Sequence, residues 1–303
     1  MEGTYYKEWS AVLNRDMEFK VYGQGGVPVL ALPARGGRFY DWENNGMPEA
    51  AARLLREGKV QLFCADSIDA ESLLNGNAAP RRRAEMQEKY FLYLTTELAP
   101  RILALNAPAA KTEGAEKDAK PVETAPILWC AGVDTGAYQA VNCRLRRPEL
   151  FAGAIGLSGL YDVRRFFGRE ADDLILRNSP IAALHEDGIL DKAALAKAGE
   201  NSLLLCAGQG NYEGEALDDT QSLADALQDQ GLPAHLEIWG GDVSHDWYWW
   251  GKEFGLFAER IFDCSSLRFY CTSNISKLPI ANMPFRSALF LKIAIKRTEG
   301  SYV

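Results

Sequence analysis

The chain has 303 residues, of which 47% are hydrophobic, 11% aromatic and 24% charged, as in an ordinary globular protein. Its net charge is −8, but residues 264–303 hold six Lys and Arg against one Glu, so the first 263 residues carry −13. A body this acidic argues against nucleic acid as a partner. The length suits one large α/β domain.

The cysteines and the amino-terminal segment both favour a reducing compartment. The six cysteines are Cys64, Cys130, Cys143, Cys206, Cys264 and Cys271. They show no CxxC spacing of the metal-binding type, and three lie in apolar runs, where a thiol acts as a small core residue. The first residues lack the features of a signal peptide, and no run approaches the roughly 20 apolar residues of a membrane span. We therefore expect a cytoplasmic protein with no metal, no cofactor and no membrane span.

The first third of the chain predicts edge strands, a central strand and a strand-helix-strand unit. Residues 4–34 alternate polar and apolar positions and become continuously apolar over Val27–Leu32. Lys59–Asp66 repeats the buried-strand pattern, and Met47–Gly58 between them is helical with a glycine at its end. A second helix is expected from about Arg81 to Leu105.

The middle of the chain contains the most informative motif. Residues 107–125 are charged and alanine-rich, which predicts a solvated loop. A short buried strand, Pro126–Ala131, and a helix, Thr135–Arg147, then flank the sequence Gly-Val-Asp-Thr-Gly. This sequence has the G-x-S-x-G frame of a nucleophile elbow, a sharp turn that lifts its central residue above the sheet. Asp134 stands where the serine should be.

Three further strands complete the expected sheet. They are Phe151–Leu157, Ser202–Ala207, which precedes a helix through Leu227, and His235–Trp239, which precedes a helix over Asp246–Phe262. Residues from about 162 to 200 are expected to cap the carboxyl ends of the strands, where open α/β sheets bind ligands. We expect one domain over residues 1–263, and a basic tail, residues 264–303, that is poorly packed or foreign to the fold.

Six stretches of the chain carry a resemblance to a known family. They are Pro33–Tyr40, Asp66–Ser72, Gly132–Asn142, Leu157–Asp162, Gly208–Glu213 and Trp239–Trp247. In this order they resemble the esterase family of α/β-hydrolases that includes esterase D and the antigen 85 acyltransferases, and above all its compact bacterial members. The resemblance covers roughly residues 5–262. It implies a mostly parallel central sheet with helices on both faces.

The resemblance also implies a catalytic triad in the chain order nucleophile, acid, histidine. By position these are Asp134, Glu213 and His245, so two of the three match the family. Glu215, Asp218 and Asp219 compete with Glu213, because any of these acids could simply favour the start of the next helix. His185 and His235 are weaker candidates than His245.

The oxyanion donors implied by the resemblance are the backbone N–H of Thr135 and one from the loop after the first central strand, at Gly37 or Arg38. Ser158 ends a strand but lacks a glycine two residues later and the helix of an elbow. We interpret it as a residue that lines the pocket rather than a substitute nucleophile.

Asp134 has a structural explanation that needs no function. Asp is a preferred N-cap residue, and its carboxylate could accept the N–H of Gly136 or Ala137, a contribution on the order of 1 kcal/mol. It also tolerates the positive φ of an elbow better than most residues.

As a nucleophile, Asp134 is ill suited to ester hydrolysis. The ionised carboxylate would hold His245 as an imidazolium and so remove the general base. It would also attract the oxyanion donors, and its attack on an ester would give a high-energy mixed anhydride. Esterase turnover is therefore expected to be weak or absent.

Two alternatives remain open. A carboxylate nucleophile can attack alkyl carbon, as in the haloalkane dehalogenases and epoxide hydrolases. The tryptophans of Trp247–Trp250, however, favour core packing or a pocket wall over halide binding. The other alternative is a pseudoenzyme that binds a small ester, acyl or sugar-like ligand or a protein partner. The sequence does not predict the oligomeric state.

Overall fold

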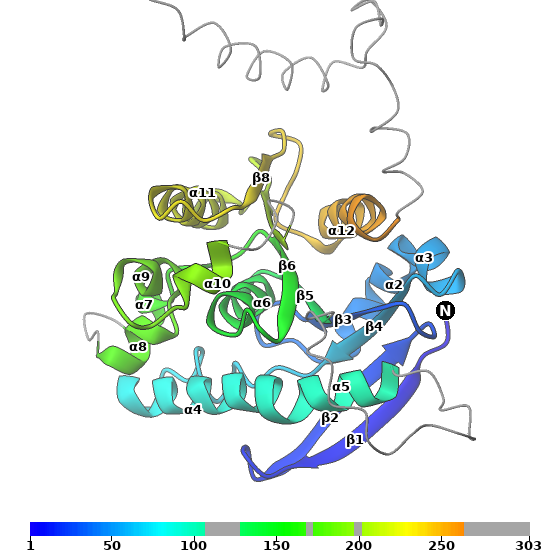
Figure 1. Ribbon diagram of the computed structural model, residues 1–303, viewed down its shortest axis with the longest axis horizontal. Helices are drawn as coiled ribbons and strands as arrows, with labels where there is room; N and C mark the ends of the chain where they lie inside the picture. Colours follow the sequence, from blue (N-terminus) through cyan, green and yellow to red (C-terminus); the bar gives the residue numbers. More distant parts are fainter. Residues whose placement is uncertain (107–127, 168–171, 197–201, 264–303) are drawn as a thin grey trace, which may run out of the picture. The chain divides into compact units, whose positions relative to one another are not determined.

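Eight strands form one sheet in this computed structural model, in the order β1-β2-β4-β3-β5-β6-β7-β8 (Figure 1). The structure describes residues 1–106, 128–167, 172–196 and 202–263. The strands are β1 (Thr4–Ser10), β2 (Arg15–Tyr22), β3 (Val27–Leu32), β4 (Val60–Ala65), β5 (Leu128–Val133), β6 (Phe151–Leu157), β7 (Leu203–Ala207) and β8 (His235–Ile238). β2 pairs antiparallel with β1 and β4, and every other pair is parallel. This arrangement confirms the predicted α/β class with an antiparallel amino-terminal edge.

Helices cover both faces of the sheet, and each layer has its own apolar core (Figure 1). The helices are α1 (Asp41–Asn44), α2 (Met47–Ala50), α3 (Ala52–Arg56), α4 (Pro80–Leu92), η1 (Tyr93–Leu98), α5 (Ala99–Asn106), α6 (Thr135–Arg146), α7 (Arg164–Phe167), α8 (Asp173–Arg177), α9 (Pro180–His185), α10 (Lys192–Ala196), α11 (Gly214–Asp229) and α12 (Trp247–Phe262). In one core, side chains of α4, α5, α6, α9 and α11 pack against one face of the sheet, on residues such as Leu30 and Phe63. The other packs α1, α2, α3 and α12 on alternate side chains such as Val29 and Leu62. The central strands are buried on both sides, which explains their continuous apolar sequences.

Two predicted helices differ in detail from the structure. The helix expected over Met47–Gly58 is divided into α2 and α3, because Ala51 leaves the helical conformation. The division lies where α12 packs closely, since a Cβ added at Gly255 would stand 2.9 Å from the carbonyl oxygen of Ala50. The helix expected from Arg81 to Leu105 is continuous over α4, η1 and α5, but η1 is a wider π turn.

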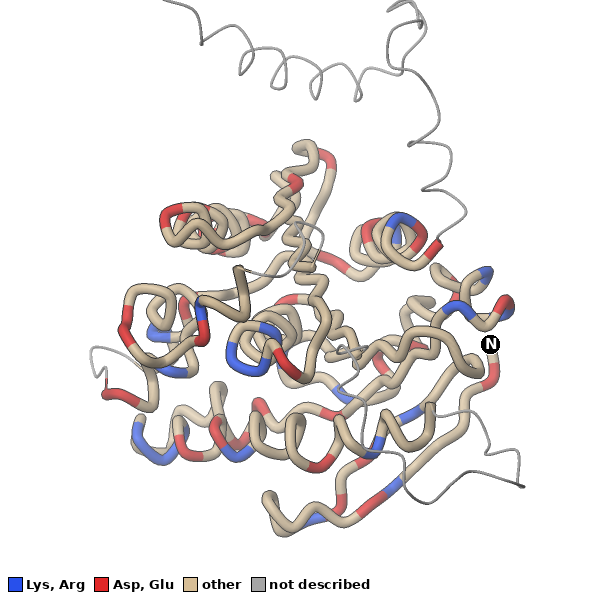
Figure 2. Tube along the Cα trace, in the orientation of Figure 1, with Lys and Arg blue, Asp and Glu red and all other residues tan. Residues whose placement is uncertain are grey.

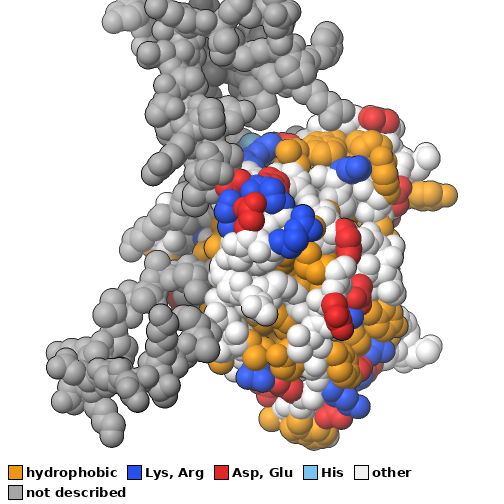
Figure 3. Space-filling view, turned by 90° about the vertical axis from the view of Figure 1, so that its right-hand side faces the viewer, with side chains coloured by type: hydrophobic (Ala, Val, Ile, Leu, Met, Phe, Trp, Pro, Cys, Tyr) orange, Lys and Arg blue, Asp and Glu red, His pale blue; other side chains and the backbone are white. Residues whose placement is uncertain are grey.

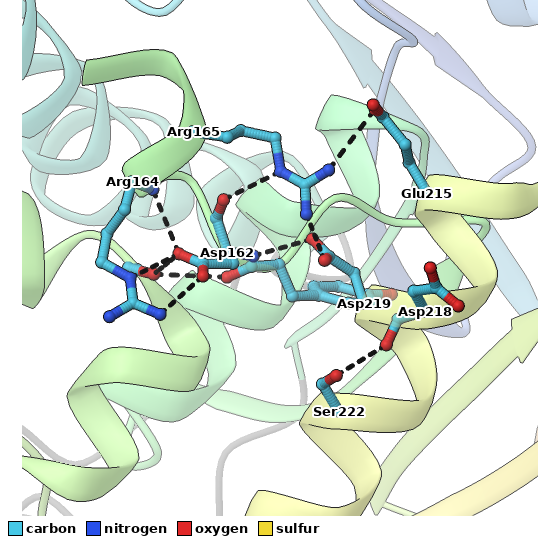
Figure 4. Close-up of polar contacts among 9 residues, drawn as sticks. Asp162, Arg164, Arg165, Glu215, Asp218, Asp219 and Ser222 are labelled. Atoms are coloured by element: carbon cyan, nitrogen blue, oxygen red, sulfur yellow. Dashed lines mark hydrogen bonds and ion pairs between the residues drawn. The ribbon is translucent and has the colours of Figure 1, made fainter. Parts of the chain in front are cut away.

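The segment between β6 and β7 contains α7, α8, α9 and α10, whose main contacts with the rest of the fold are with α4, α6 and α11. Figure 4 shows the polar contacts that join α7 to α11. Arg165 pairs with Asp219, and Asp219 also accepts the backbone N–H of Asp162 at 2.9 Å. These contacts make the segment part of one helical layer. A cap over the strand ends stays a prediction.

Acidic and basic residues are interspersed along the helices and loops of the described chain (Figure 2). On the face shown in Figure 3, basic and acidic side chains lie close together among apolar ones. The visible part of this face therefore lacks the broad basic surface typical of a nucleic-acid site. Within the described residues, no helix is both long and apolar enough to cross a membrane. The predicted loop at 107–125 and the predicted tail at 264–303 lie outside the described residues.

Candidate active site

The turn between β5 and α6 has the geometry of a nucleophile elbow. Asp134 has φ 54° and ψ −120°, a strained conformation for a residue other than glycine. A Cβ added at Gly132 would stand 2.0 Å from the carbonyl oxygen of Gly136, and one at Gly136 would stand 2.4 Å from that of Leu32. Both glycines are therefore required for the close approach of α6 to β5 and β3. The elbow predicted from the spacing of these glycines is present.

The residues at the three predicted triad positions lie together at the carboxyl ends of β5, β7 and β8. The imidazole Nε2 of His245 is 3.7 Å from Asp134 Oδ1, and its Nδ1 is 3.5 Å from Glu213 Oε2. These separations are those of ion pairs rather than hydrogen bonds. The backbone N–H of His245 donates to the carbonyl of Asn211 at 2.9 Å, which ties the histidine loop to the turn before Glu213.

The other candidates lie elsewhere or have other partners. Asp219 is paired with Arg165, whereas Glu213 is buried beside His245. His235 contacts Glu237 at 2.9 Å in the last strand. Glu215 lies 3.4 Å from Arg165, and Asp218 and His185 are exposed on α11 and α9. Among the acids and histidines considered from the sequence, Glu213 and His245 are therefore the pair that the fold brings to the elbow.

Ser158 is buried against Glu213, and its pocket-lining role stays a prediction. Its side chain is fully buried, its φ is 49°, and its hydroxyl donates to Glu213 Oε1 at 2.7 Å. The indole N–H of Trp250 donates to the Ser158 hydroxyl at 3.0 Å. The ring of Trp250 also lies edge-on to the imidazole of His245, with 4.8 Å between ring centroids. Ser158 and Trp250 thus position both the acid and the histidine.

Asp134 does not cap α6, contrary to the structural explanation considered from the sequence. Its carboxylate makes no hydrogen bond to the first N–H groups of the helix. It is turned instead toward the loop after β3, where Oδ2 accepts the backbone N–H of Arg35 at 3.0 Å. Oδ1 accepts a guanidinium N–H of Arg35 at 3.3 Å. The strained turn aims the carboxylate at this loop and at His245.

The oxyanion donor predicted on this loop, at Gly37 or Arg38, has another acceptor at both positions. The N–H of Gly37 donates to the Ala34 carbonyl at 2.8 Å, and that of Arg38 donates to the Asp41 carboxylate at 2.9 Å. Both N–H groups therefore already have acceptors within the local turn. On this loop it is the N–H of Arg35 that reaches the elbow residue, where it donates to Asp134 Oδ2. Thr135 directly follows the elbow residue, and its N–H stays the second predicted donor.

Sequence reasoning also missed Asp69, which fixes the loop after β3 against the elbow. Its carboxylate Oδ2 accepts the hydroxyl of Thr135 at 2.7 Å and the backbone N–H of Gly36 at 3.2 Å. Asp69 lies within one of the six stretches that carry the family resemblance, but neither its partners nor its burial can be read from that stretch.

Charge in the site favours a protonated histidine. Burial disfavours the imidazolium, but the adjacent carboxylates of Asp134 and Glu213 outweigh burial and raise the pKa of His245 to about 9. Burial also opposes ionisation of Asp134, yet His245 and Arg35 outweigh it and hold the pKa of Asp134 below its ordinary value. At neutral pH the site therefore holds a carboxylate next to an imidazolium, and the histidine has no free lone pair at Nε2.

Two of the central side chains of the candidate site are little exposed to solvent. The side chain of Asp134 is 6% exposed and that of His245 is 17% exposed, whereas the side chain of Arg35 is 44% exposed. Phe166 of α7 lies beside Arg35, with 6.0 Å from the guanidinium carbon to the ring centroid. Within the described ranges, no group of acidic, histidine or cysteine side chains has the arrangement of a metal site.

No protein-family model matches the chain, and no curated protein matches its sequence. Solved structures do match it. A ferulic acid esterase aligns with a TM-score of 0.62 and 17% identity, covering 86% of this chain and 98% of its own. An S-formylglutathione hydrolase from Agrobacterium tumefaciens gives 0.61 and 16%, covering 86% and 95%. MPT51 from Mycobacterium tuberculosis gives 0.59 and 15%, covering 87% and 98%. At these identities the likeness shows the fold alone, and the chain has the α/β-hydrolase fold.

Proposed function

We propose that this protein is an esterase-type α/β-hydrolase in which Asp134 occupies the position of the nucleophile, so that turnover of ordinary carboxylic esters is weak or absent. One observation carries the proposal. The Asp134 carboxylate accepts the Arg35 N–H and forms an ion pair with His245, so it engages both the oxyanion donor and the base of an esterase site.

The chemistry of ester hydrolysis requires both of those groups to be free. A serine nucleophile transfers its proton to a neutral histidine, and the carbonyl oxygen of the ester moves onto backbone N–H groups as it gains charge. The pKa of about 9 leaves little neutral His245 at pH 7. The Arg35 N–H already has an anionic acceptor, so an ester carbonyl would have to displace it.

The retained surroundings of the site favour ligand binding as the alternative role. Ser158 and Trp250 form a hydrogen-bonded chain that supports Glu213, the proposed acid, although Asp134 stands at the nucleophile position. A pseudoenzyme that binds a small ester, acyl or sugar-like molecule would use the same residues. The two forms of the proposal differ in turnover and not in the site itself.

The decisive experiment compares hydrolysis of short p-nitrophenyl esters by the parent protein, Asp134→Ser and Asp134→Ala, each shown to be folded by circular dichroism. We expect Asp134→Ser to exceed both others by on the order of 100-fold or more, because it restores a nucleophile and frees the base and the oxyanion donor. Asp134→Ala is the matched control, since it removes the carboxylate without supplying a nucleophile. Activity of the parent equal to that of Asp134→Ser would overturn the proposal.

A second candidate reaction is attack of Asp134 on alkyl carbon. The contact of His245 with both Asp134 and Glu213 favours it, because a carboxylate nucleophile needs a histidine nearby. In the first step Oδ1 or Oδ2 bonds to the carbon, and bromide departs with its electron pair. In the second step water gives a proton to His245 and attacks the acyl carbon of the alkyl ester, which releases the alcohol and restores the carboxylate. The second step needs neutral His245, so alcohol formation from short bromoalkanes should rise steeply toward pH 9, and its measurement over pH 7–10 tests this reaction.

The proposed location is the cytoplasm. Among the described residues, Cys64, Cys130, Cys143 and Cys206 are all buried and free of disulfides. Free thiols packed as core residues are compatible with a reducing compartment. Thiol titration of the native and the unfolded protein, isolated without reductant, would detect any disulfide that contradicts this proposal.

A further inference from the structure

Asp69 is a buried carboxyl that joins the elbow helix to the loop after β3. The residue is 1% exposed, and its Oδ2 accepts the hydroxyl of Thr135 at 2.7 Å and the backbone N–H of Gly36 at 3.2 Å. Thr135 is the first residue of α6, and Gly36 directly follows Arg35. A single oxygen atom of Asp69 therefore connects α6 to the loop that donates to the elbow residue.

The bond to Gly36 restrains the backbone beside the Arg35 N–H. Gly36 has φ 66°, in the left-handed region that residues other than glycine rarely adopt. Its N–H belongs to the peptide group on one side of the Arg35 Cα. The N–H on the other side of that Cα donates to Asp134 Oδ2 at 3.0 Å. Loss of the Asp69 acceptor would therefore allow the loop to turn the Arg35 N–H away from the elbow.

Two neighbours of Asp69 hold the far end of the same loop. The Ser67 hydroxyl donates to the Gly37 carbonyl at 2.9 Å, and the Phe39 N–H donates to Asp66 Oδ1 at 2.9 Å. Neither of these contacts involves α6. Asp69 differs from both neighbours because its side chain bonds to the loop and to the elbow helix at once.

We propose that Asp69 is a positioning residue, which holds the N–H groups of Arg35 and Thr135 at the spacing that an ester oxyanion requires. This role rests on the proposed function, because these two N–H groups are the oxyanion donors of an esterase-type site. Asp69 acts through these residues rather than on the ester itself. A displacement of about 1 Å at such a site can lower the rate on the order of 100-fold.

The contacts of Asp69 require an acceptor oxygen rather than a charge. Both bonds end on Oδ2, whereas Oδ1 has no hydrogen-bond partner within the described ranges. Asp69→Asn can place its amide oxygen at the Oδ2 position and keep both bonds, with its NH2 group at the Oδ1 position. Asp69→Ala leaves the Thr135 hydroxyl and the Gly36 N–H without this acceptor.

The test measures kcat and KM for p-nitrophenyl acetate in Asp134→Ser and in the same protein with Asp69→Ala or Asp69→Asn added, each shown to be folded by circular dichroism. We expect Asp69→Ala to lower kcat by on the order of 100-fold and to change KM by less than about threefold. Oxyanion donors act mainly on charge that forms in the transition state, so their displacement affects kcat. Asp69→Asn should keep kcat within about fivefold of Asp134→Ser, because both bonds are retained.

Two further variants separate this role from a general loosening of the loop. Thr135→Val keeps the backbone N–H but removes the hydroxyl, and in Asp134→Ser it should lower kcat by on the order of 10-fold. Ser67→Ala is the matched control, since it removes one bond to the same loop, at Gly37, and should lower kcat by less than about threefold. Equal losses in Asp69→Ala and Ser67→Ala would overturn the specific role of Asp69. An Asp69→Ala protein with undiminished kcat would do the same.

Amide hydrogen exchange of the protein without the serine substitution requires no turnover. We expect the Arg35 N–H to exchange at least about 10-fold faster in Asp69→Ala than in the parent, and at an unchanged rate in Asp69→Asn. If Asp134→Ser cleaves no ester, the proposed function is wrong, and the exchange rates alone decide whether Asp69 sets the Arg35 N–H. An unchanged rate in Asp69→Ala would overturn the positioning role whether or not esters are cleaved.

Discussion

At the scale of single residues, the Asp134 carboxylate changes what its neighbours can do. Oδ2 engages Arg35, and Oδ1 lies near both Arg35 and His245. A serine hydroxyl in the same place would be neutral and shorter, and would leave the Arg35 N–H without an anionic acceptor. The same substitution therefore affects the nucleophile, the base and the oxyanion donor together.

The protonation of His245 is directly measurable. We predict a pKa of about 9 for His245 in the parent and a lower value in Asp134→Asn, because that variant removes one of its two carboxylate neighbours. NMR titration of the imidazole resonances is practical, since the chain has only three histidines. His185 and His235 serve as internal references. A parent pKa near 6.5 would contradict the ion pair.

The same group links stability to pH. The folded-state pKa of His245 is raised from 6.5 to about 9, so its contribution to stability is fully present below about 6.5. That contribution is lost as the pH rises through about 9. Asp134 has the opposite sign, since its lowered pKa contributes stability that disappears only at acid pH.

Glu253 is a second carboxyl behind the site, and it should be protonated at neutral pH. It is fully buried in α12, and neither oxygen has a hydrogen-bond partner in the described ranges. Burial, together with the charge of Glu213, raises the pKa of Glu253 to about 8. The stability that this protonated form provides is therefore present below about 4.5 and lost as the pH rises through about 8.

We predict that Glu253→Gln stabilises the protein at pH 9 by on the order of a few kcal/mol and much less at pH 5, because glutamine never has to lose a proton. Urea denaturation at the two pH values measures the difference. Glu259→Gln on the same helix is the control, since Glu259 is partly exposed and paired with Arg53. An equal effect of Glu253→Gln at both pH values would contradict a buried titrating carboxyl.

At the scale of elements, the elbow depends on two glycines with different neighbours. We predict that Gly132→Ala destabilises the protein by about 3 kcal/mol or more, because its Cβ would collide with the backbone of Gly136 at the start of α6. Gly76→Ala is the matched control, since a Cβ there meets no atom within 4 Å. Chemical denaturation of both variants gives the comparison. A Gly132→Ala protein as stable as Gly76→Ala would rule out this packing.

The sequence predicts features that depend on local contacts better than features that depend on contacts between distant segments. The elbow and the strands depend on local spacing and pattern, and these predictions agree with the structure. The triad positions Asp134, Glu213 and His245 come from the family resemblance, and their catalytic roles stay a prediction. The roles of Arg35, Asp69 and Ser158 depend on which loops meet in space. Nothing in the local sequence distinguishes the Arg35 N–H from those of Gly37 and Arg38, which the turn consumes.

At the scale of the whole molecule, both apolar cores of the described fold lie within residues 1–263. The chain divides into one unit over Met1–Asp263 and another over Cys264–Val303, and both apolar cores belong to the first. The end of α12 is tied back to the amino-terminal half, because Asp263 contacts Lys59 at 2.8 Å and also pairs with Arg53. These ion pairs hold the carboxyl end of α12 against α3 and the start of β4.

We predict that a chain ending at Asp263 folds alone and keeps a Tm within about 2 °C of the full chain, since truncation removes no described core residue. It should also keep any activity gained by Asp134→Ser. A chain ending at Asp246 is the control, because it deletes α12 and with it the buried rings of Trp250, Phe254 and Phe257. That protein should fail to give a cooperative thermal transition. If truncation at Asp263 has the same effect, residues 264–303 are part of the folding unit and the predicted domain boundary is wrong.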